Sequence, residues 1–369
     1  MKTDSVIVFR KYLLPYSETF IAAQGGFLHR YTPLYAGFKN DSSGLDMLED
    51  SSRFVLEDYA QNLSVSKMLH RLGLVNKQWL RDLQQQNPSV VHAHFLKDGL
   101  DALPLKNKLS VPLVTTLHGH DIAKKEKRSF FGRTRKRFFD DVDKVIVVSD
   151  YIYNCAVKNG CPEDKLVKHF IGIDIDKFSA EKCETESPEI LFVGRLVEKK
   201  GCIYLLQAMK ILKKKHPELK LTIVGDGPLR ESLSAFVQVE SLNVEFVGRE
   251  NSDQIRERLS RTWVFVAPSI TAKSGDAEGL AMVFLEAQAM STPIVSYDSG
   301  GIAQGVENGV TGYLHKEKDV NGLVESIEYF IENADVRKQF GNKGRERVET
   351  FFNVRKQCAL LESIYDSVR

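Results

Sequence analysis

Residues 190–201 read ILFVGRLVEKKG, an apolar run that passes directly into a glycine-containing turn with cations on it. A short run rich in Ile, Leu and Val predicts a buried strand of a parallel sheet. Open α/β sheets bind ligands at the carboxyl ends of their strands, so Arg195 and Lys200 are expected at a binding site. A helix that begins at Cys202 would aim its first amides at the same place, which suits a diphosphate.

Short apolar runs alternate with amphipathic stretches on both sides of this segment, which predicts an α/β fold with two doubly wound, Rossmann-like domains. In the first half, the expected strands are residues 6–9, 33–37, 90–95, 112–118, 145–148 and 166–170. In the second half, they are residues 190–193, 219–224, 244–247, 263–266, 293–296 and 311–314. The polar stretch 179–189 lacks apolar periodicity, so we place the linker there and expect domains at 1–178 and 179–351.

Composition excludes several classes of protein. The chain has 369 residues, is 43% hydrophobic and 27% charged, and carries a formal charge of +2, which excludes collagen-like and disordered chains. The near balance of 51 basic and 49 acidic side chains argues against a surface that tracks nucleic acid. Five cysteines without metal-ligand spacing support neither a disulfide framework nor a zinc site, and no apolar run reaches the ~20 residues of a membrane span. We therefore expect a cytoplasmic protein.

A second informative segment, residues 275–295, reads GDAEGLAMVFLEAQAMSTPIV. It places Glu278 in a loop and Glu286 inside the following helix, and an ionised carboxylate can accept hydrogen bonds from vicinal hydroxyls of a sugar or ribose. A helix cap and a solvated helix face would give the same spacing. Amides at the start of this helix could hold phosphate oxygens. Those amides belong to Gly279, Leu280 and Ala281.

The order of the motifs in the second half resembles the retaining glycosyltransferases of family 4, which have the GT-B fold of two Rossmann-like domains facing across a cleft. The motifs are GRLVEKKG, the GDGP turn that begins at Gly225, Val247-Gly248-Arg249, the two glutamates, Ser299-Gly300-Gly301 and NGVTGYL at 308–314. The wording of residues 266–290, together with LLPYSETFI at 13–21, is most similar to bacterial exopolysaccharide, colanic-acid-type and O-antigen transferases. The resemblance also implies that a last helix, about residues 352–369, packs back on the first domain.

This resemblance implies roles for the donor-side residues. Arg195 and Lys200 would hold the donor diphosphate, Glu286 the ribose and Glu278 the transferred sugar. Gly225 would belong to the donor site as well, and the backbone of Val247, Gly248 and Arg249 would face the base.

In the first half, LVTTLHGHDIA at 113–123 ends a buried strand at His118. By resemblance, His118 reaches the donor sugar or its phosphate, while Asp121 and the helix mouth at Ser17 and Glu18 lie on the acceptor side. A plain N-cap would explain Ser17 equally well. His-x-His can also ligate zinc, but His92 and His94 are expected on their own strand, in opposite or core-facing positions.

Two Asp-x-Asp pairs, at 141–143 and 174–176, could suggest a metal site. The first precedes a strand and the second lies where a turn suffices. Because Arg195 and Lys200 can neutralise a diphosphate, we expect no metal and no cofactor.

Residues 124–139, KKEKRSFFGRTRKRFF, hold eight cations and four phenylalanines. Such a run is typical of a solvated face, but the interleaved aromatics favour an anionic membrane surface. Nucleic acid is not expected, because no nucleic-acid-binding motif accompanies the run. The residues expected to contact lipid are Lys124, Lys125, Lys127, Arg128, Phe130, Phe131, Arg133, Arg135, Lys136 and Arg137.

Together these features predict a retaining, metal-independent hexosyltransferase. It would use a nucleotide diphosphate sugar, UDP rather than GDP, and a glycan or lipid-linked glycan acceptor at the cytoplasmic face of the membrane. A sugar-nucleotide epimerase or phosphorylase on the same fold is an alternative, as is a non-catalytic sugar-nucleotide-binding assembly subunit.

Overall fold

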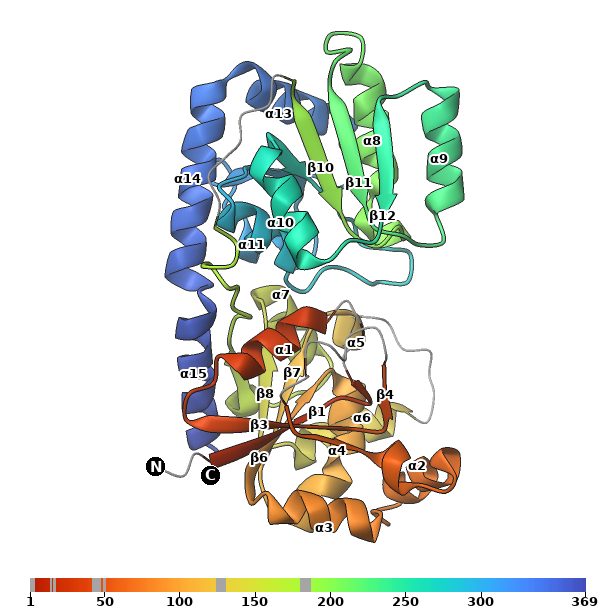
Figure 1. Cartoon of the computed structure of the whole chain (residues 1–369), viewed down its shortest axis with the longest axis vertical. Helices are drawn as coiled ribbons and strands as arrows, with labels where there is room; N and C mark the ends of the chain where they lie inside the picture. Colours follow the sequence, from red (N-terminus) through yellow and green to blue (C-terminus); the bar gives the residue numbers. More distant parts are fainter. Residues whose placement is uncertain are drawn as a thin grey trace. The chain divides into compact units, whose positions relative to one another are not determined.

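The computed structural model describes residues 4–13, 15, 18–41, 48, 51–123, 131–179 and 187–369. The chain folds as two compact units, and helices cover the sheet of each one (Figure 1). Unit 1 consists of residues 1–172 and 354–369, and unit 2 of residues 173–353.

Unit 1 is built on a parallel sheet in the order β5-β3-β1-β6-β7-β8-β9. Its strands are β1 (Asp4–Phe9), β3 (Tyr31–Gly37), β5 (Arg53–Val55), β6 (Pro88–His94), β7 (Leu113–Leu117), β8 (Lys144–Val147) and β9 (Leu166–Lys168). Its helices are α1 (Thr19–Gly26), α2 (Leu63–Arg71), α3 (Lys77–Gln85), α4 (Leu96–Leu109), α5 (His120–Ala123), α6 (Phe131–Asp141), α7 (Asp150–Lys158) and α15 (Val354–Asp366), with short 3-10 turns η3 (Leu56–Tyr59) and η4 (Glu163–Lys165). A separate small pair is formed by β2 (Tyr12–Leu13) and β4 (Lys39–Asn40).

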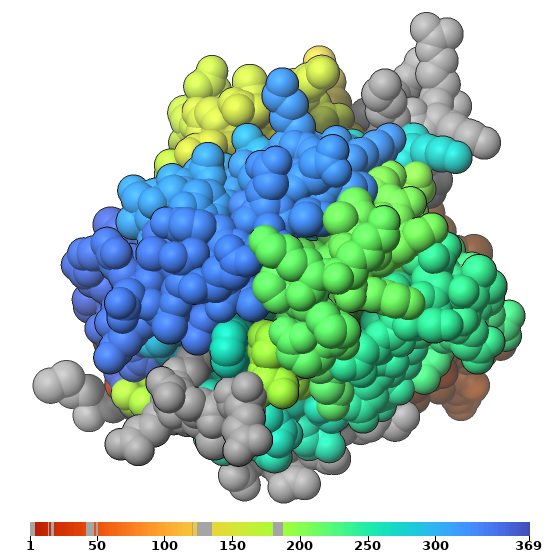
Figure 2. All heavy atoms as spheres, turned by 90° about the horizontal axis from the view of Figure 1, so that it is seen from above, coloured from red at the N-terminus to blue at the C-terminus, as the bar shows by residue number. Residues whose placement is uncertain are grey.

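Unit 2 has a parallel sheet in the order β12-β11-β10-β13-β14-β15. Its strands are β10 (Glu189–Val193), β11 (Lys220–Val224), β12 (Val244–Gly248), β13 (Val264–Val266), β14 (Ile294–Tyr297) and β15 (Gly312–His315). Its helices are η5 (Glu198–Lys200), α8 (Cys202–Leu212), α9 (Arg230–Val239), α10 (Ser252–Arg261), α11 (Met282–Ala289), α12 (Ile302–Gly305), α13 (Val320–Glu332) and α14 (Ala334–Phe351). On one face of this unit α8, in green, lies beside α13, in blue (Figure 2).

The α/β prediction is confirmed, and every strand expected from the apolar runs is present. The sequence analysis missed β2, β4 and β5. These strands are only two or three residues long. No apolar run marks them in the sequence. They are extended because they pair with a neighbouring strand, not because of their local sequence.

The chain passes between the units earlier than the expected boundary after residue 178. The division falls after Gly172 and again after Asn353. Residues 173–178 belong to unit 2 because α14 holds them: the Arg345 guanidinium donates to the carbonyl oxygens of Phe178 at 2.7 Å and Ile175 at 3.1 Å. The last helix, α15, belongs to unit 1.

Among the residues that the structure describes, no helix combines the length and the apolar character that crossing a bilayer requires.

Candidate functional site

Glycines bring the loops at the carboxyl end of the unit 2 sheet into backbone contact. Gly225 has a φ of +132°, and a Cβ there would lie 2.1 Å from the Gly194 carbonyl oxygen. Gly300 has a φ of +59°, and a Cβ would lie 2.4 Å from the Glu278 carbonyl oxygen. Side chains are therefore excluded at both positions, and the turns after β10, β11 and β14 form one tightly packed edge.

Lys200 and Glu278, to which the family resemblance gives different parts of a donor, form an ion pair. Lys200 Nζ lies 2.8 Å from Glu278 Oε1, and the two side chains are only 16% and 9% exposed. Burial acts to raise the pKa of Glu278, but the charges of Lys200 and Lys199 hold it below its ordinary value. The carboxylate is therefore ionised at neutral pH, and a ligand would meet a preformed pair of opposite charges.

Arg195 follows Gly194 at the end of β10 and is exposed. Within the part of the chain that the structure describes, its guanidinium has no ion-pair partner. Arg195 is thus available to a ligand anion, whereas the charge of Lys200 is already shared with Glu278.

Glu286 lies inside α11, as the sequence predicted, but the helix starts later than expected. It begins at Met282, so the amides of Gly279, Leu280 and Ala281 precede the helix instead of forming its first turn. Burial raises the pKa of Glu286 to about 7, an effect that the charge of Lys177 partly offsets. This carboxyl group therefore changes charge near neutral pH.

The residues expected to face the nucleotide base lie at the same end of the unit 2 sheet, beside the turn after β11. Val247 and Gly248 end β12, and the Gly225 amide donates to the Gly248 carbonyl oxygen at 2.6 Å. Gly248 has a φ of +79°. Arg249 is exposed beyond the strand. The structure thus brings the glycine turn after β11 and the end of β12 together.

In unit 1, Glu18 is an ion-pair partner within the fold. The Arg10 guanidinium donates to both oxygens of Glu18, at 2.7 and 2.5 Å, and it also pairs with Asp98. Burial raises the pKa of Asp98 to about 6, against the opposing effect of Arg10. Ser17 lies outside the described residues, and α1 begins at Thr19 with no side-chain bond from its N-cap residue, Glu18.

Asp121 holds the turn that follows β7. Its carboxylate accepts hydrogen bonds from the amides of Leu96 at 3.0 Å, Gly119 at 2.9 Å and His118 at 3.3 Å. The geometry gives this buried carboxylate a local task. It fixes the backbone that carries His118.

Sequence reasoning missed a histidine ladder next to His118. His92 and His94 lie on one face of β6, because their spacing of two matches the period of a strand. Their ring centroids are 4.4 Å apart, and His94 Nδ1 lies 3.1 Å from His118 Nε2. The two histidines face the core, which was one of the two expectations from the sequence. The expectation of opposite positions is wrong, and the strand period was the signal that could have corrected it.

The basic aromatic run only partly matches a membrane patch. Arg135 is buried, with its guanidinium bonded to Asn159 and to the Asp121 carbonyl oxygen, so its predicted lipid contact is wrong. Phe138 and Phe139 are 0% exposed, whereas Lys136 and Arg137 face solvent. Lys124, Lys125, Lys127, Arg128 and Phe130 lie outside the described residues, as do the side chains of Phe131 and Arg133.

The carboxylates of the Asp-x-Asp pairs that the structure details are engaged within the fold. Asp143 accepts the Leu113 amide at 2.7 Å and lies 2.6 Å from Lys106 Nζ. Asp174 accepts two amides of its own turn. Neither arrangement resembles an open metal site.

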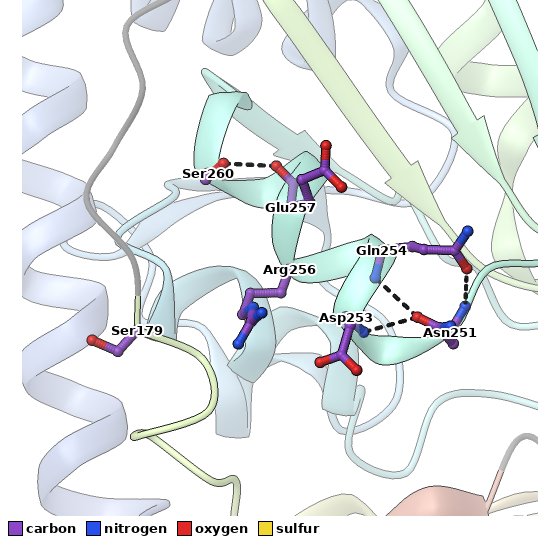
Figure 3. Close-up of a pocket in the computed structure, with 7 residues that line it drawn as sticks. All are labelled: Ser179, Asn251, Asp253, Gln254, Arg256, Glu257 and Ser260. Carbon is purple, nitrogen blue, oxygen red and sulfur yellow. Dashed lines mark hydrogen bonds between the residues drawn. The ribbon is translucent and has the colours of Figure 1, made fainter.

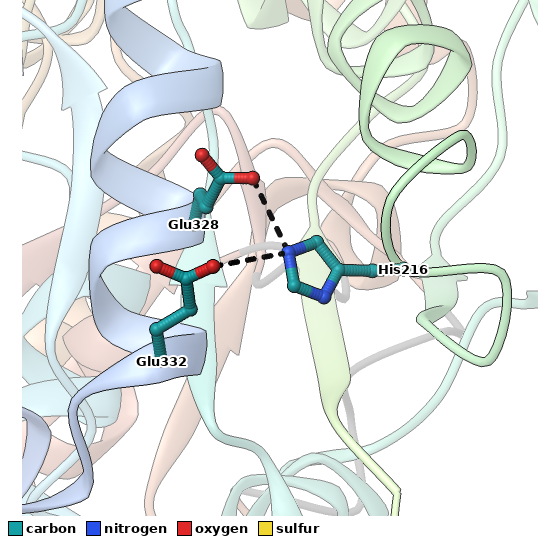
Figure 4. Close-up of side chains that lie close together, drawn as sticks. All are labelled: His216, Glu328 and Glu332. Atoms are coloured by element: carbon teal, nitrogen blue, oxygen red, sulfur yellow. Dashed lines mark hydrogen bonds and ion pairs between the residues drawn. The ribbon is translucent and has the colours of Figure 1, made fainter.

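A different group of possible ligand atoms lies at the far end of α8 from Gly201 (Figure 4). Atoms of His216, Glu328 and Glu332 lie within 4.8 Å of one another. Lys215 Nζ is 3.0 Å from both carboxylates and already neutralises much of their charge. This group lies at the opposite end of the sheet from the glycine turns.

Unit 2 also contains a cavity of about 550 Å³, lined by residues with polar side chains, between residue 179 and α10 (Figure 3). Its walls include Asn251 and Gln254, which form the capping box of α10, and Arg256, which donates to the Lys177 carbonyl oxygen at 3.3 Å. None of the predicted site residues lines it.

Comparisons with known proteins cover almost the whole chain. The profile of the family described as glycosyl transferases group 1 matches residues 174–347, and that of glycosyltransferase family 4 matches residues 22–177. The putative colanic acid biosynthesis glycosyltransferase WcaL of Escherichia coli K12 is 30% identical over 74% of this chain and 70% of its own length. The amylovoran biosynthesis glycosyltransferase AmsK of Erwinia amylovora is 30% identical over 65% of this chain and 60% of its own.

Solved structures share the fold. The Anabaena protein Alr3699/HepE, crystallised with UDP and glucose, superposes with a TM-score of 0.78 at 18% identity, covering 99% of this chain and 100% of that one. This similarity confirms the expected GT-B architecture of two Rossmann-like units.

Proposed function

The chain belongs to the family 4 glycosyltransferases, and from this membership we propose that it transfers a hexosyl group from a nucleotide diphosphate sugar to a glycan hydroxyl in surface polysaccharide biosynthesis. We further propose that the transfer retains anomeric configuration and needs no metal. The observation that carries the proposal is the exposed Arg195 beside the Lys200–Glu278 pair, at a glycine-packed strand end.

In the proposed reaction the bond between the sugar C1 and the β-phosphate oxygen breaks, and a bond from the acceptor oxygen to C1 forms on the same face. The acceptor proton passes to the departing β-phosphate. Arg195 and Lys200 would stabilise the charge that develops on the diphosphate, and one such donor is worth roughly 3 to 4 kcal/mol. His118 would donate a hydrogen bond to a sugar or phosphate oxygen.

The Lys200–Glu278 ion pair explains how one end of the unit 2 sheet could bind both the sugar and the phosphate of a donor. Glu278 is ionised and can accept hydrogen bonds from sugar hydroxyls, while Lys200 donates to phosphate from the other side of the pair. Glu286, further along α11, would take the ribose. We assign UDP over GDP by analogy with the Anabaena protein, whose complex holds UDP.

Nucleotide release tests the activity directly. The purified chain is incubated with a panel of UDP- and GDP-sugars, with and without glycan acceptors, and free nucleotide diphosphate is measured. Acceptor-dependent release from one donor, with a product of unchanged anomeric configuration, supports the proposal. Conversion of the donor sugar without release would indicate an epimerase. Formation of sugar 1-phosphate from the glycan and inorganic phosphate, without a nucleotide sugar, would indicate a phosphorylase, and binding without turnover would indicate an assembly subunit.

We also propose a lipid-linked acceptor and peripheral contact with an anionic membrane. In the described part of the basic run, only Lys136 and Arg137 are exposed cations. Helix α2 and the turn after it add a larger apolar surface, with Val65 46%, Met68 57% and Leu72 70% exposed. Residues 60–77 contain cations and no acidic side chain, which suits an anionic surface.

Vesicle co-sedimentation tests this contact with two matched variants. The α2 variant is Met68→Ser/Leu72→Ser, on α2 and at its C-cap, and the α6 variant is Lys136→Ser/Arg137→Ser. We expect the parent protein to bind anionic vesicles, with binding that weakens as salt is added. The α2 variant should lose more of this binding than the α6 variant. Equal binding to neutral and anionic vesicles, or none to either, would contradict the proposal. Turnover with a water-soluble acceptor should be unchanged in both variants.

A further inference from the structure

We propose that His94 is a positioning residue for the transfer, which holds the imidazole of His118 in one orientation and one tautomer at the end of β7. This inference rests on the proposed function, in which His118 contacts the donor. It adds to the proposed mechanism a residue, His94, that contacts neither donor nor acceptor and acts only through His118.

Within the part of the chain that the structure describes, the rings of His94, Phe95 and Phe20 lie against His118, and that of His94 is polar. His94 stacks on it with centroids 5.3 Å apart and planes 21° apart, and contributes the 3.1 Å contact from Nδ1 to Nε2. The Phe95 and Phe20 rings lie 4.5 and 5.0 Å away. The phenylalanines restrict where the His118 ring can lie, but of these three rings only His94 can select which nitrogen of His118 carries hydrogen.

The backbone of Phe95, next to His118, has a strained conformation. Phe95 has a φ of +73°, a left-handed conformation that a bulky side chain rarely adopts. In this conformation its ring packs against His118 on one side and lies 4.4 Å from the Arg10 guanidinium on another. Strain of this kind persists where the surrounding structure compensates for it, and it gathers at functional sites.

His94 packs against His92, a side chain that is itself held by contacts at both ring nitrogens. Its neighbour His92 contacts the Tyr365 hydroxyl through Nδ1 at 2.7 Å and the Thr116 hydroxyl through Nε2 at 2.7 Å. Both histidines are almost fully buried. The register of β6 and β7 pairs His94 with Thr116, two residues before His118, which aligns the ladder with the end of β7.

The groups that face His94 keep it neutral. Burial, then His92, His118 and Arg10, hold the pKa of His94 well below its usual value. A neutral imidazole has one N–H and one lone pair, so the His94–His118 bond contains one of each. We assign the donor to His94 Nδ1. Hydrogen then lies on Nδ1 of His118, where it can be donated to a sugar or phosphate oxygen.

The experiment compares two replacements of His94 that separate shape from hydrogen bonding. His94→Phe keeps a ring against His118 and removes the polar contact. His94→Asn removes the ring but keeps an N–H near the position of Nδ1. We expect His94→Phe to lower kcat at least tenfold, with the donor KM changed less than threefold, and His94→Asn to recover most of the loss.

Two control variants isolate the contact between His94 and His118. His70→Phe replaces another buried histidine of unit 1, one that bonds the Asp101 carbonyl oxygen, and should leave kcat unchanged. In a His118→Ala background, His94→Phe should cause no further loss, because its effect passes through His118. Thermal unfolding of every variant separates lost activity from lost fold.

Distinct outcomes separate this inference from the function it rests on. An unchanged kcat in His94→Phe, no recovery in a folded His94→Asn, or additive losses with His118→Ala would overturn the positioning role. Full activity in His118→Ala would instead overturn the proposed role of His118 itself. If His94→Phe does not fold, the comparison of His94→Asn with His94→Leu at the same temperature decides the question.

Discussion

The two units place an arginine just beyond the first strand of their sheets and use it in opposite ways. Arg10 follows β1 in unit 1, is 9% exposed and pairs with Glu18 and Asp98. Arg195 follows β10 and Gly194 in unit 2, is exposed, and has no ion-pair partner within the described ranges. The same sheet position therefore serves the fold in one unit and is left open to a ligand in the other.

The cause of this difference lies in what each sequence places around its arginine. A buried guanidinium needs counter-ions, and unit 1 supplies Glu18 beside α1 and Asp98 from α4. In unit 2 the corresponding turn packs against glycine backbone at Gly225, which offers no side chain to pair with Arg195. Each prediction below tests this contrast, beginning with the largest expected effect.

Removing the buried arginine should cost the most. We expect Arg10→Met to lower the free energy of unfolding by about 3 to 5 kcal/mol, because two buried carboxylates lose their cation. Denaturant unfolding measures this, with Arg195→Met as the matched control that should change stability by less than about 0.5 kcal/mol. An equal loss in both variants would abolish the contrast.

The loss in Arg10→Met should also depend on pH. Asp98 has a pKa of about 6 in the folded chain, above its ordinary value, so its contribution to stability declines as pH rises through that range. Without Arg10 this pKa rises further. The difference between variant and parent should therefore be smaller at pH 5 than at pH 8.

Lys200 should combine both kinds of effect. Lys200→Ala is expected to lower turnover at least ~100-fold. It also leaves Glu278 buried without its 2.8 Å partner, so stability should fall too. The double variant Lys200→Ala/Glu278→Gln should regain the stability and not the turnover; recovery of both would refute the donor-site assignment.

Arg195 should affect activity alone. We expect Arg195→Ala to reduce turnover at least ~100-fold with an unchanged melting curve, since an exposed cation without a partner contributes little to folding. Nucleotide release and thermal unfolding on the same preparation provide the test. Near-normal turnover would show that this open cation does not meet the diphosphate.

Glu286 should give a smaller, pH-dependent effect. With a pKa of about 7, its ionised fraction rises from about one tenth to nine tenths between pH 6 and pH 8. If the carboxylate accepts ribose hydroxyls, affinity for UDP should rise up to about tenfold over this range. Calorimetry on Glu286→Gln, which cannot ionise, corrects for the titration of UDP itself; an equal pH dependence in the variant would contradict the assignment.

A chelator should have the smallest effect. If Arg195 and Lys200 supply the positive charge at the donor site, as proposed, turnover will be unchanged by EDTA. Loss of activity that Mn²⁺ restores would show that a metal shares this task.

The sequence by itself determined the features that depend on local pattern. Apolar runs predicted the longer strands, because a strand buried on both faces needs continuous hydrophobic residues. Glycines at 194 and 225 marked the turns, and residues 278 and 286 were assigned correctly to a loop and a helix. The order of these motifs was enough to indicate the family.

Tertiary structure alone decided which charged and polar groups meet. Strand order brings Asp98 to Arg10 across 88 residues, and α15 brings Tyr365 to His92 across 273. It also buries Arg135 against Asn159 and joins Lys200 to Glu278. Ion pairs and hydrogen bonds act over a few ångströms and depend on burial, so they follow from the packing of distant segments, which periodicity along the chain does not encode.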